Sequence, residues 1–153
     1  MPSIDINFFR NRQNLMQSQS PIRHQVVIGV GIDLVEIKRI KKAIRRWGER
    51  FEKRVFTVQE IDYCGKEEVG FQRFAARFAA KEATLKALGT GLVGDMRWHD
   101  VEVISNPSGQ PHLQLSGSVA NCANQMGASQ MLLSLSHTGN YAIANVILLG
   151  TTN

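Results

Sequence analysis

The pattern of apolar positions predicts a long amphipathic helix over residues 71–86, ended by a glycine at position 89. Five apolar side chains fall on one narrow stripe when consecutive residues are placed about 100° apart: Phe71, Phe74, Ala75, Phe78 and Leu85. Gly89 suits the left-handed backbone conformation that often ends a helix. We expect this helix to be the element around which the rest of the chain is organised.

Glu82 lies near the centre of this stripe, where a leucine would be the ordinary choice. An isolated buried carboxylate is very costly, so Glu82 must be paired, protonated or bound to a metal. The pattern places three cations, Arg77, Lys81 and Lys86, on the flanks of the stripe. One inward acid bordered by cations suits a metal ion that holds a polyphosphate.

Residues 26–34, VVIGVGIDL, form a short apolar run rich in β-branched side chains, which predicts a buried strand. Asp33 interrupts its end. One explanation for both misplaced acids is that Asp33 and Glu82 meet across the core and bind a hard cation. The alternative is that each carboxylate caps a helix or pairs with a nearby arginine. Asp33 could cap a helix that starts near Glu36, since Asp is a favoured N-cap residue.

Residues 36–54 predict a second helical stretch, with apolar side chains at spacings of three and four: Ile37, Ile40, Ile44, Trp47 and Phe51. This stretch carries nine Lys and Arg against three Glu, a net charge of +6, whereas the whole chain is only +5. A solvated face usually mixes both signs. A one-sided basic helix therefore indicates docking of nucleic acid, an anionic membrane or an acidic protein.

Thr57 and Glu60 have the spacing of a capping box, which predicts a short helix through about Cys64. The second half of the chain predicts strands, one helix and a hairpin: strands 98–105 and 112–115, helix 117–126, and strands 131–137 and 141–149 joined by residues 138–140. His137 lies at the edge of this hairpin, with either a structural or a functional role. The order β-α-α-α-β-β-α-β-β predicts an α+β fold with an antiparallel sheet packed on the long helix.

The length of 153 residues predicts one domain over residues 26–153 and leaves little room for a deep cleft, so a neighbouring subunit is expected to complete the active site. Residues 1–25 are polar and predict a disordered or loosely attached extension that lacks the apolar run of a signal peptide. Cys64 and Cys122 lack metal-site spacing, which predicts free thiols in the cytoplasm. No apolar run is long enough to span a membrane.

Three motifs occur together and in order: GIDLVEIKRI at 31–40, RFAARFAAKEATLKALGTG at 73–91 and SLSHTGNYAIANV at 134–146. This combination closely resembles holo-[acyl-carrier-protein] synthases, the small trimeric class of 4′-phosphopantetheinyl transferases. The segments at 54–61 and 106–117 also look like that family. The resemblance covers residues 26–149, which is nearly the whole chain apart from the N-terminal extension.

The resemblance implies a fold and a reaction that agree with the residue pattern. Members of this family transfer 4′-phosphopantetheine from coenzyme A to a serine of apo-acyl carrier protein, release adenosine 3′,5′-bisphosphate, and serve fatty-acid biosynthesis. They are homotrimers with coenzyme A between protomers. The implied partners of this chain are therefore coenzyme A, an acyl carrier protein and further copies of itself, rather than nucleic acid.

The resemblance also implies roles for single residues. The family's Mg²⁺-binding aspartate and glutamate fall on Asp33 and Glu82, and its lysine near the phosphates falls on Lys86; these three are the expected catalytic residues. Arg77 and His137 fall on positions that contact coenzyme A. Arg39 falls on the arginine that holds the acidic helix of the carrier. The general base stays open between Glu82 and a water bound to the metal.

Two other function classes remain to be compared with this one. A nucleic-acid-binding protein would use the basic stretch at 36–54, but it would leave the two acids in apolar settings unexplained. A metal-dependent phosphohydrolase or nuclease would use these acids, although two-metal sites usually need more carboxylates. An assay distinguishes the three classes. A transferase shows Mg²⁺-dependent transfer from coenzyme A, a phosphohydrolase releases inorganic phosphate, and a nucleic-acid-binding protein binds DNA or RNA.

Overall fold

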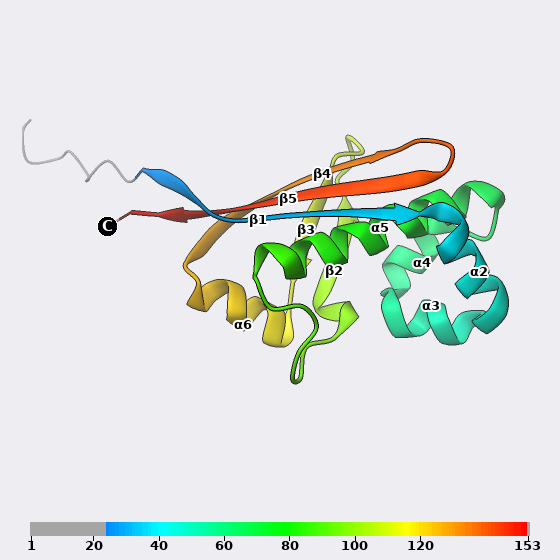
Figure 1. Cartoon of the computed structure of the whole chain (residues 1–153), viewed down its shortest axis with the longest axis horizontal. Coiled ribbons are helices and arrows are strands. Elements are labelled where there is room, and N and C mark those ends of the chain that lie inside the picture. The colour runs from blue at the N-terminus through cyan, green and yellow to red at the C-terminus, as the bar shows by residue number, and fades with distance from the viewer. Residues whose placement is uncertain (1–23, 153) are drawn as a thin grey trace, which may run out of the picture.

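A computed structural model describes residues 24–152 of the chain (Figure 1). Nearly all of the predicted extension, residues 1–25, lies outside the described residues. Within that range the elements follow in this order: β1 (Gln25–Glu36), α2 (Ile37–Trp47), α3 (Glu49–Val55), α4 (Val58–Cys64), α5 (Glu68–Ala87), the 3₁₀ helix η1 (Trp98–Asp100), β2 (Val101–Ser105), β3 (Pro111–Leu115), α6 (Gly117–Gln125), β4 (Ala128–His137) and β5 (Tyr141–Thr151).

The main sheet has three antiparallel strands in the order β1-β5-β4. Along β5, alternate residues from Ala142 to Leu148 are completely buried and face α5, as the two-residue period of a strand requires. All helices lie on this side of the sheet (Figure 1). The predicted α+β fold, with an antiparallel sheet on a long helix, is confirmed.

Two glycines let α5 approach the backbone of β1. A Cβ atom at Gly31 would collide with the carbonyl oxygen of Ala83, and one at Gly29 would collide with that of Ala87. Both contacts are with rigid helix backbone, so neither can relax by moving a side chain. The glycines of the predicted strand therefore fix how closely α5 lies against the edge strand that carries Asp33.

The prediction of a single apolar stripe on α5 is wrong. The sheet covers one side of the helix, while α4 and the β2–β3 hairpin pack against another, so α5 is buried around most of its circumference. Lys81 is completely buried instead of lying on a flank, and Arg77 is only 4 % exposed. Glu82 is half-buried, at the border of the packed surface rather than at its centre.

The predicted helix over residues 36–54 is two helices. Gly48 adopts a φ of 53°, which ends α2 and begins α3, and this break adds one helix to the predicted order. Ile37 and Ile40 are buried as the periodicity predicts. Trp47, at the break, is 52 % exposed and does not belong to the core.

The later elements follow the predictions with small shifts. Strand β2 begins at Val101 rather than Trp98, because Asp100 accepts a hydrogen bond from the backbone N–H of Arg97 and stabilises a 3₁₀ turn. Thr138 and Tyr141 close the predicted hairpin with two backbone hydrogen bonds of 2.9 and 3.2 Å.

Cys64 and Cys122 are free cysteines and form no disulfide with each other. Among the described residues no helix has the length and apolar character that crossing a membrane requires. The free thiols agree with the sequence-based expectation for the two cysteines.

Candidate active site

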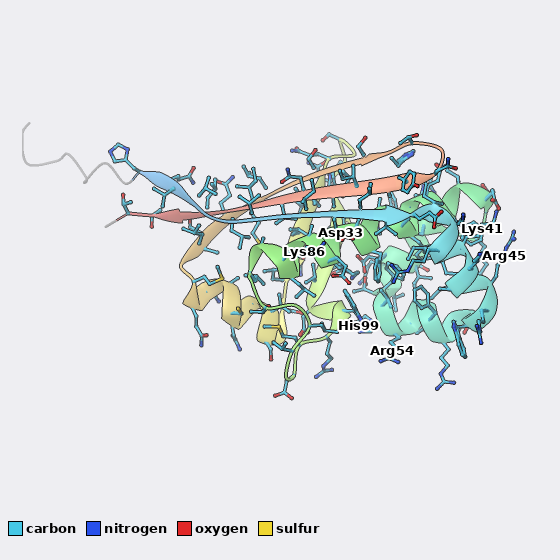
Figure 2. The ribbon with its side chains drawn as sticks, in the orientation of Figure 1. Asp33, Lys41, Arg45, Arg54, Lys86 and His99 are labelled. Carbon is cyan, nitrogen blue, oxygen red and sulfur yellow. The ribbon has the colours of Figure 1, made fainter. Side chains whose placement is uncertain are left out.

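Asp33 lies within β1, on the face of the sheet that α5 covers. It is paired with Ala144 of β5, and its side chain is 14 % exposed. Its carboxylate accepts a 2.7 Å hydrogen bond from Lys86 Nζ, which also donates to the carbonyl of Ile32 at 3.1 Å. Figure 2 shows Asp33 and Lys86 where β1 passes over α5. The alternative that Asp33 caps a helix is wrong, because α2 begins after Glu36.

Glu82 lies on α5 one turn before Lys86, so the two side chains share one face of the helix. Burial raises the pKa of Glu82, and the negative charge of Asp33 raises it further. Lys86 and Arg39 act in the opposite direction. The structure therefore brings together four of the predicted residues, from β1, α2 and α5, as one electrostatic cluster.

The donor set of this cluster fits Mg²⁺ that is shared with a phosphate ligand. Residues 24–152 contain no group of three or more His, Cys, Asp or Glu side chains that could enclose a metal. Mg²⁺ is commonly held by one or two carboxylates, with waters and substrate phosphates completing its octahedron. Asp33 and Glu82 would supply these two carboxylates.

Arg77 and His137 lie together on another flank of α5. They border a cavity of about 360 Å³, whose wall also includes Tyr63, Arg73 and Ser105. The guanidinium of Arg77 stacks on the Tyr63 ring, with its carbon 3.9 Å from the ring centroid. Within the described residues, Arg77 has no carboxylate in ion-pair contact, and its buried Nε has no hydrogen-bond partner. A buried cation without an acid indicates an anion-binding position.

The two groups of residues face different ways. Arg77 and Glu82 are five positions apart on α5, which separates their side chains by about 140° around the helix. Asp33 is on edge strand β1 and His137 on edge strand β4, with β5 between them. The structure thus brings together the Asp33 cluster and, separately, the Arg77–His137 pair, but it does not bring these two halves into one cavity.

The structure also sorts the cations of the basic stretch. Four have acidic partners: Lys38 with Glu36, Lys41 and Arg45 with Glu68, and Lys53 with Glu49. Among the described residues, the other five make no ion pair: Arg39, Lys42, Arg46, Arg50 and Arg54. We call these five the unpaired basic stripe. These cations are spread along α2 and α3, from Arg39, which is close enough to Glu82 to lower its pKa, to Arg54.

Sequence reasoning missed two features near this stripe. Trp47 borders a cavity of about 400 Å³ together with Arg50 and Arg54, whereas the periodicity placed its ring in the core. Phe51 also borders this cavity, but its ring does pack against the core, next to Phe56. A completely buried ion pair joins Lys81 to Glu60. The capping box identified Glu60 as a helix cap, but a second role for its carboxylate had no separate signal in the sequence.

Comparison with known proteins identifies the family. Residues 29–146 match the model of the 4′-phosphopantetheinyl transferase superfamily. The holo-[acyl-carrier-protein] synthase of Koribacter versatilis is 48 % identical over 123 residues, covering 80 % of this chain and 98 % of that protein. That of Desulforudis audaxviator is 47 % identical over 125 residues, covering 82 % of this chain and 95 % of that protein.

Solved structures agree with the sequence comparison. A holo-[acyl-carrier-protein] synthase from Neisseria meningitidis superposes with a TM-score of 0.73 at 28 % identity, covering 80 % of this chain and 98 % of that one. One from Helicobacter pylori in complex with coenzyme A gives 0.68 at 31 % identity, covering 78 % and 98 %. The resemblance drawn from the three motifs is confirmed, and the chain belongs to the 4′-phosphopantetheinyl transferase superfamily, a family of enzymes.

Proposed function

We propose that this chain transfers 4′-phosphopantetheine from coenzyme A to a serine of an apo-acyl carrier protein in the cytoplasm, in the service of fatty-acid biosynthesis. The observation that carries the proposal is the cluster of Asp33, Glu82 and Lys86 between β1 and α5. Relatives at up to 48 % identity are holo-[acyl-carrier-protein] synthases, and one structural neighbour holds coenzyme A. The membership of this family argues against both alternatives from the sequence, a nucleic-acid-binding protein and a phosphohydrolase.

Asp33 and Glu82 are the residues that would hold Mg²⁺. When bound, the metal supplies positive charge to the pyrophosphate of coenzyme A, which lowers the cost of developing negative charge there. Lys86, whose ammonium reaches the carboxylate of Asp33, would contact the same phosphates. Its contribution is to stabilise the departing bisphosphate nucleotide.

The reaction exchanges one phosphorus–oxygen bond for another. The carrier serine oxygen bonds to the phosphorus that bears the pantetheine arm, and the bond from that phosphorus to the bridging pyrophosphate oxygen breaks, so that adenosine 3′,5′-bisphosphate leaves. The serine proton would pass to Glu82 or to a water held by the metal, since both lie at the reacting end of the site. Most of the catalysis in such a transfer is positioning and electrostatics.

The basic stripe is proposed as the docking surface for the carrier. Its five cations have no acidic partner among the described residues, so an acidic helix can satisfy them without breaking an existing ion pair. Arg39 lies at the end of the stripe close enough to Glu82 to influence its pKa. A carrier held along the stripe would therefore present its serine at the metal end, with Trp47 offering an apolar contact at the far end.

A homotrimer is proposed because one protomer holds the two halves of the site on different flanks of α5. In a cyclic assembly, the Asp33 cluster of one copy would face the Arg77–His137 cavity of the next. The sheet supports an assembly, since Val30, Ile32 and Leu34 are each more than half exposed. No helix of the described residues covers this outer, apolar face (Figure 1).

Intact-mass spectrometry tests the proposed reaction. An apo-acyl carrier protein is incubated with the chain, coenzyme A and Mg²⁺, with EDTA as the control. The account predicts a mass gain of one phosphopantetheine arm that EDTA abolishes. No mass gain with several different acidic carriers would contradict the proposed function, and a gain that persists in EDTA would contradict the metal requirement.

A further inference from the structure

Lys81 and Glu60 form a buried ion pair that the proposed chemistry does not use. Both side chains are completely buried, and Lys81 Nζ lies 2.7 Å from the Glu60 carboxylate. Burial lowers the pKa of Lys81, while the charge of Glu60 opposes that effect. Because solvent does not reach either group, neither can contact a phosphate. The role of the pair therefore depends on the segments of the chain that it connects.

The pair joins three separate segments through directional bonds. Lys81 Nζ donates to the carbonyl of Trp98 at 3.1 Å and to that of Val101. Glu60 accepts hydrogen bonds from the backbone N–H groups of Thr57 at 2.9 Å and Val103 at 3.0 Å. The start of α4, the η1–β2 segment and the middle of α5 are therefore tied to one point.

The buried surface of α5 combines two large apolar side chains, Phe74 and Leu85, with many small ones. Much of this surface consists of alanines, whose small side chains interlock little with their neighbours: Ala75, Ala76, Ala79, Ala80, Ala83 and Ala87. A buried ion pair is often no more stabilising than apolar residues of the same volume, so added stability is a poor explanation for it. Its bonds are directional, however, and they are satisfied at only one rotation of the helix.

We propose that Lys81 and Glu60 are positioning residues that hold α5 at the rotation in which Glu82 faces Asp33. Lys81 and Glu82 are consecutive, so their side chains point about 100° apart around the helix. The Gly31–Ala83 contact sets the distance of α5 from β1, and the buried pair sets its rotation. This inference rests on the proposed role of Glu82 as a metal ligand.

The test removes the charges of the pair together. In Lys81→Met/Glu60→Gln, the amide oxygen can still accept a backbone hydrogen bond, and no unpaired charge remains buried. Mn²⁺ binding is measured by electron paramagnetic resonance in the presence of coenzyme A, alongside kcat. We expect Mn²⁺ affinity and kcat each to fall by about 10- to 100-fold, the range seen when partners that orient metal ligands are removed.

Val119→Ala is the matched control, because Val119 is completely buried in α6 and makes no part of the site or the network. This variant should lose thermal stability and keep the Mn²⁺ affinity of the wild type. If the double variant does not fold, Lys81→Gln/Glu60→Gln, which leaves no buried charge and keeps an N–H donor at position 81, should show a weakening of Mn²⁺ binding in the same direction.

The outcomes separate this inference from the proposed function. A wild-type chain that transfers the arm and binds Mn²⁺, together with a folded variant that does both equally well, overturns the positioning role alone. A wild-type chain that neither transfers the arm nor binds Mn²⁺ overturns both proposals. Weakened Mn²⁺ binding in the pair variant, with unchanged binding in Val119→Ala, supports the positioning role.

Discussion

The two flanks of α5 carry opposite charges: two carboxylates lie on one flank and a buried cation on the other. On the β1 flank, Asp33 and Glu82 are near each other, and Lys86 and Arg39 offset their negative charge. On the β4 flank, Arg77 is buried against Tyr63, and no carboxylate of the described residues lies within ion-pair distance of it. One flank is suited to a cation with phosphates, and the other to an anion. One helix therefore carries two groups of predicted site residues on different flanks, and we propose that neighbouring copies bring the two groups to one ligand.

The largest expected effect on activity comes from substituting the two carboxylates on the β1 flank. Asp33→Asn and Glu82→Gln each remove a charge at nearly constant shape, so we expect kcat to fall by about 10²- to 10³-fold, as when a group that stabilises the transition state is lost. Steady-state transfer measured by intact mass gives the rates. Asp62→Asn on α4, away from the cluster, is the control; normal Mg²⁺-dependent activity in Glu82→Gln would contradict the assignment.

Breaking the β4 flank should change binding more than chemistry. Arg77→Ala removes a desolvated cation from its cavity, and we expect the KM for coenzyme A to rise by about 10- to 100-fold, the worth of a charge-assisted hydrogen bond. The value of kcat should change less. Arg73→Ala, which alters the wall of the same cavity, should have the smaller effect. Equal losses in both variants would show that Arg77 is not a specific contact.

Substitutions in the unpaired basic stripe should affect only the binding of the carrier protein. Arg46→Glu reverses a charge that has no acidic partner in the described residues, so we expect the KM for the carrier to rise by several-fold and its salt dependence to weaken. The KM for coenzyme A should stay constant. Lys53→Glu is the matched control, because Lys53 is paired with Glu49 at 2.7 Å. An equal effect of both reversals would indicate general charge rather than a defined surface.

The smallest effect concerns the stability of the β1 flank itself. Because the folded chain raises the pKa of Glu82, its ionised form destabilises the fold above that pKa, and the penalty disappears as the pH falls through the folded pKa toward the unfolded value. Glu82→Gln should therefore raise Tm at pH 8 and lose this advantage near pH 4. Thermal unfolding followed by circular dichroism gives both values. A variant that is less stable than wild type at pH 8 would contradict the sign.

The sequence predicted the elements better than their packing. The strand at 26–34, the capping box at Thr57 and the hairpin at 138–140 are all present, since each depends on local chemistry. The prediction that this strand is buried is wrong, because only one of its faces packs on α5, and Val30, Ile32 and Leu34 are each more than half exposed. The environment of Lys81 could not be predicted, because the segment that buries it, η1–β2, is distant along the chain. The same limit applies to Trp47, whose exposure follows from the break at Gly48.

The candidate site shows the same division. Asp33 and Glu82, the two acids that interrupt apolar patterns, lie close enough for the charge of Asp33 to raise the pKa of Glu82. Metal binding by the two acids stays a prediction. The separation of Arg77 and His137 from these acids did not follow from the residues alone, because it depends on the strand order β1-β5-β4 and on the direction of side chains around α5. Periodicity places residues on a face, whereas tertiary packing decides which neighbour that face meets.

The most direct test of the central claim is complementation between two variants, assayed at a coenzyme A concentration far below the wild-type KM, where the raised KM of Arg77→Ala leaves that variant nearly inactive. Asp33→Ala and Arg77→Ala chains are denatured, mixed in equal amounts and refolded together, and the transfer activity of the mixture is measured. If neighbouring copies supply the two half-sites, about a quarter of the interfaces combine an intact Asp33 with an intact Arg77, and activity returns to about that fraction of wild type. If both half-sites must come from one copy, the mixture stays as inactive as its parents, and the account of the two flanks is contradicted.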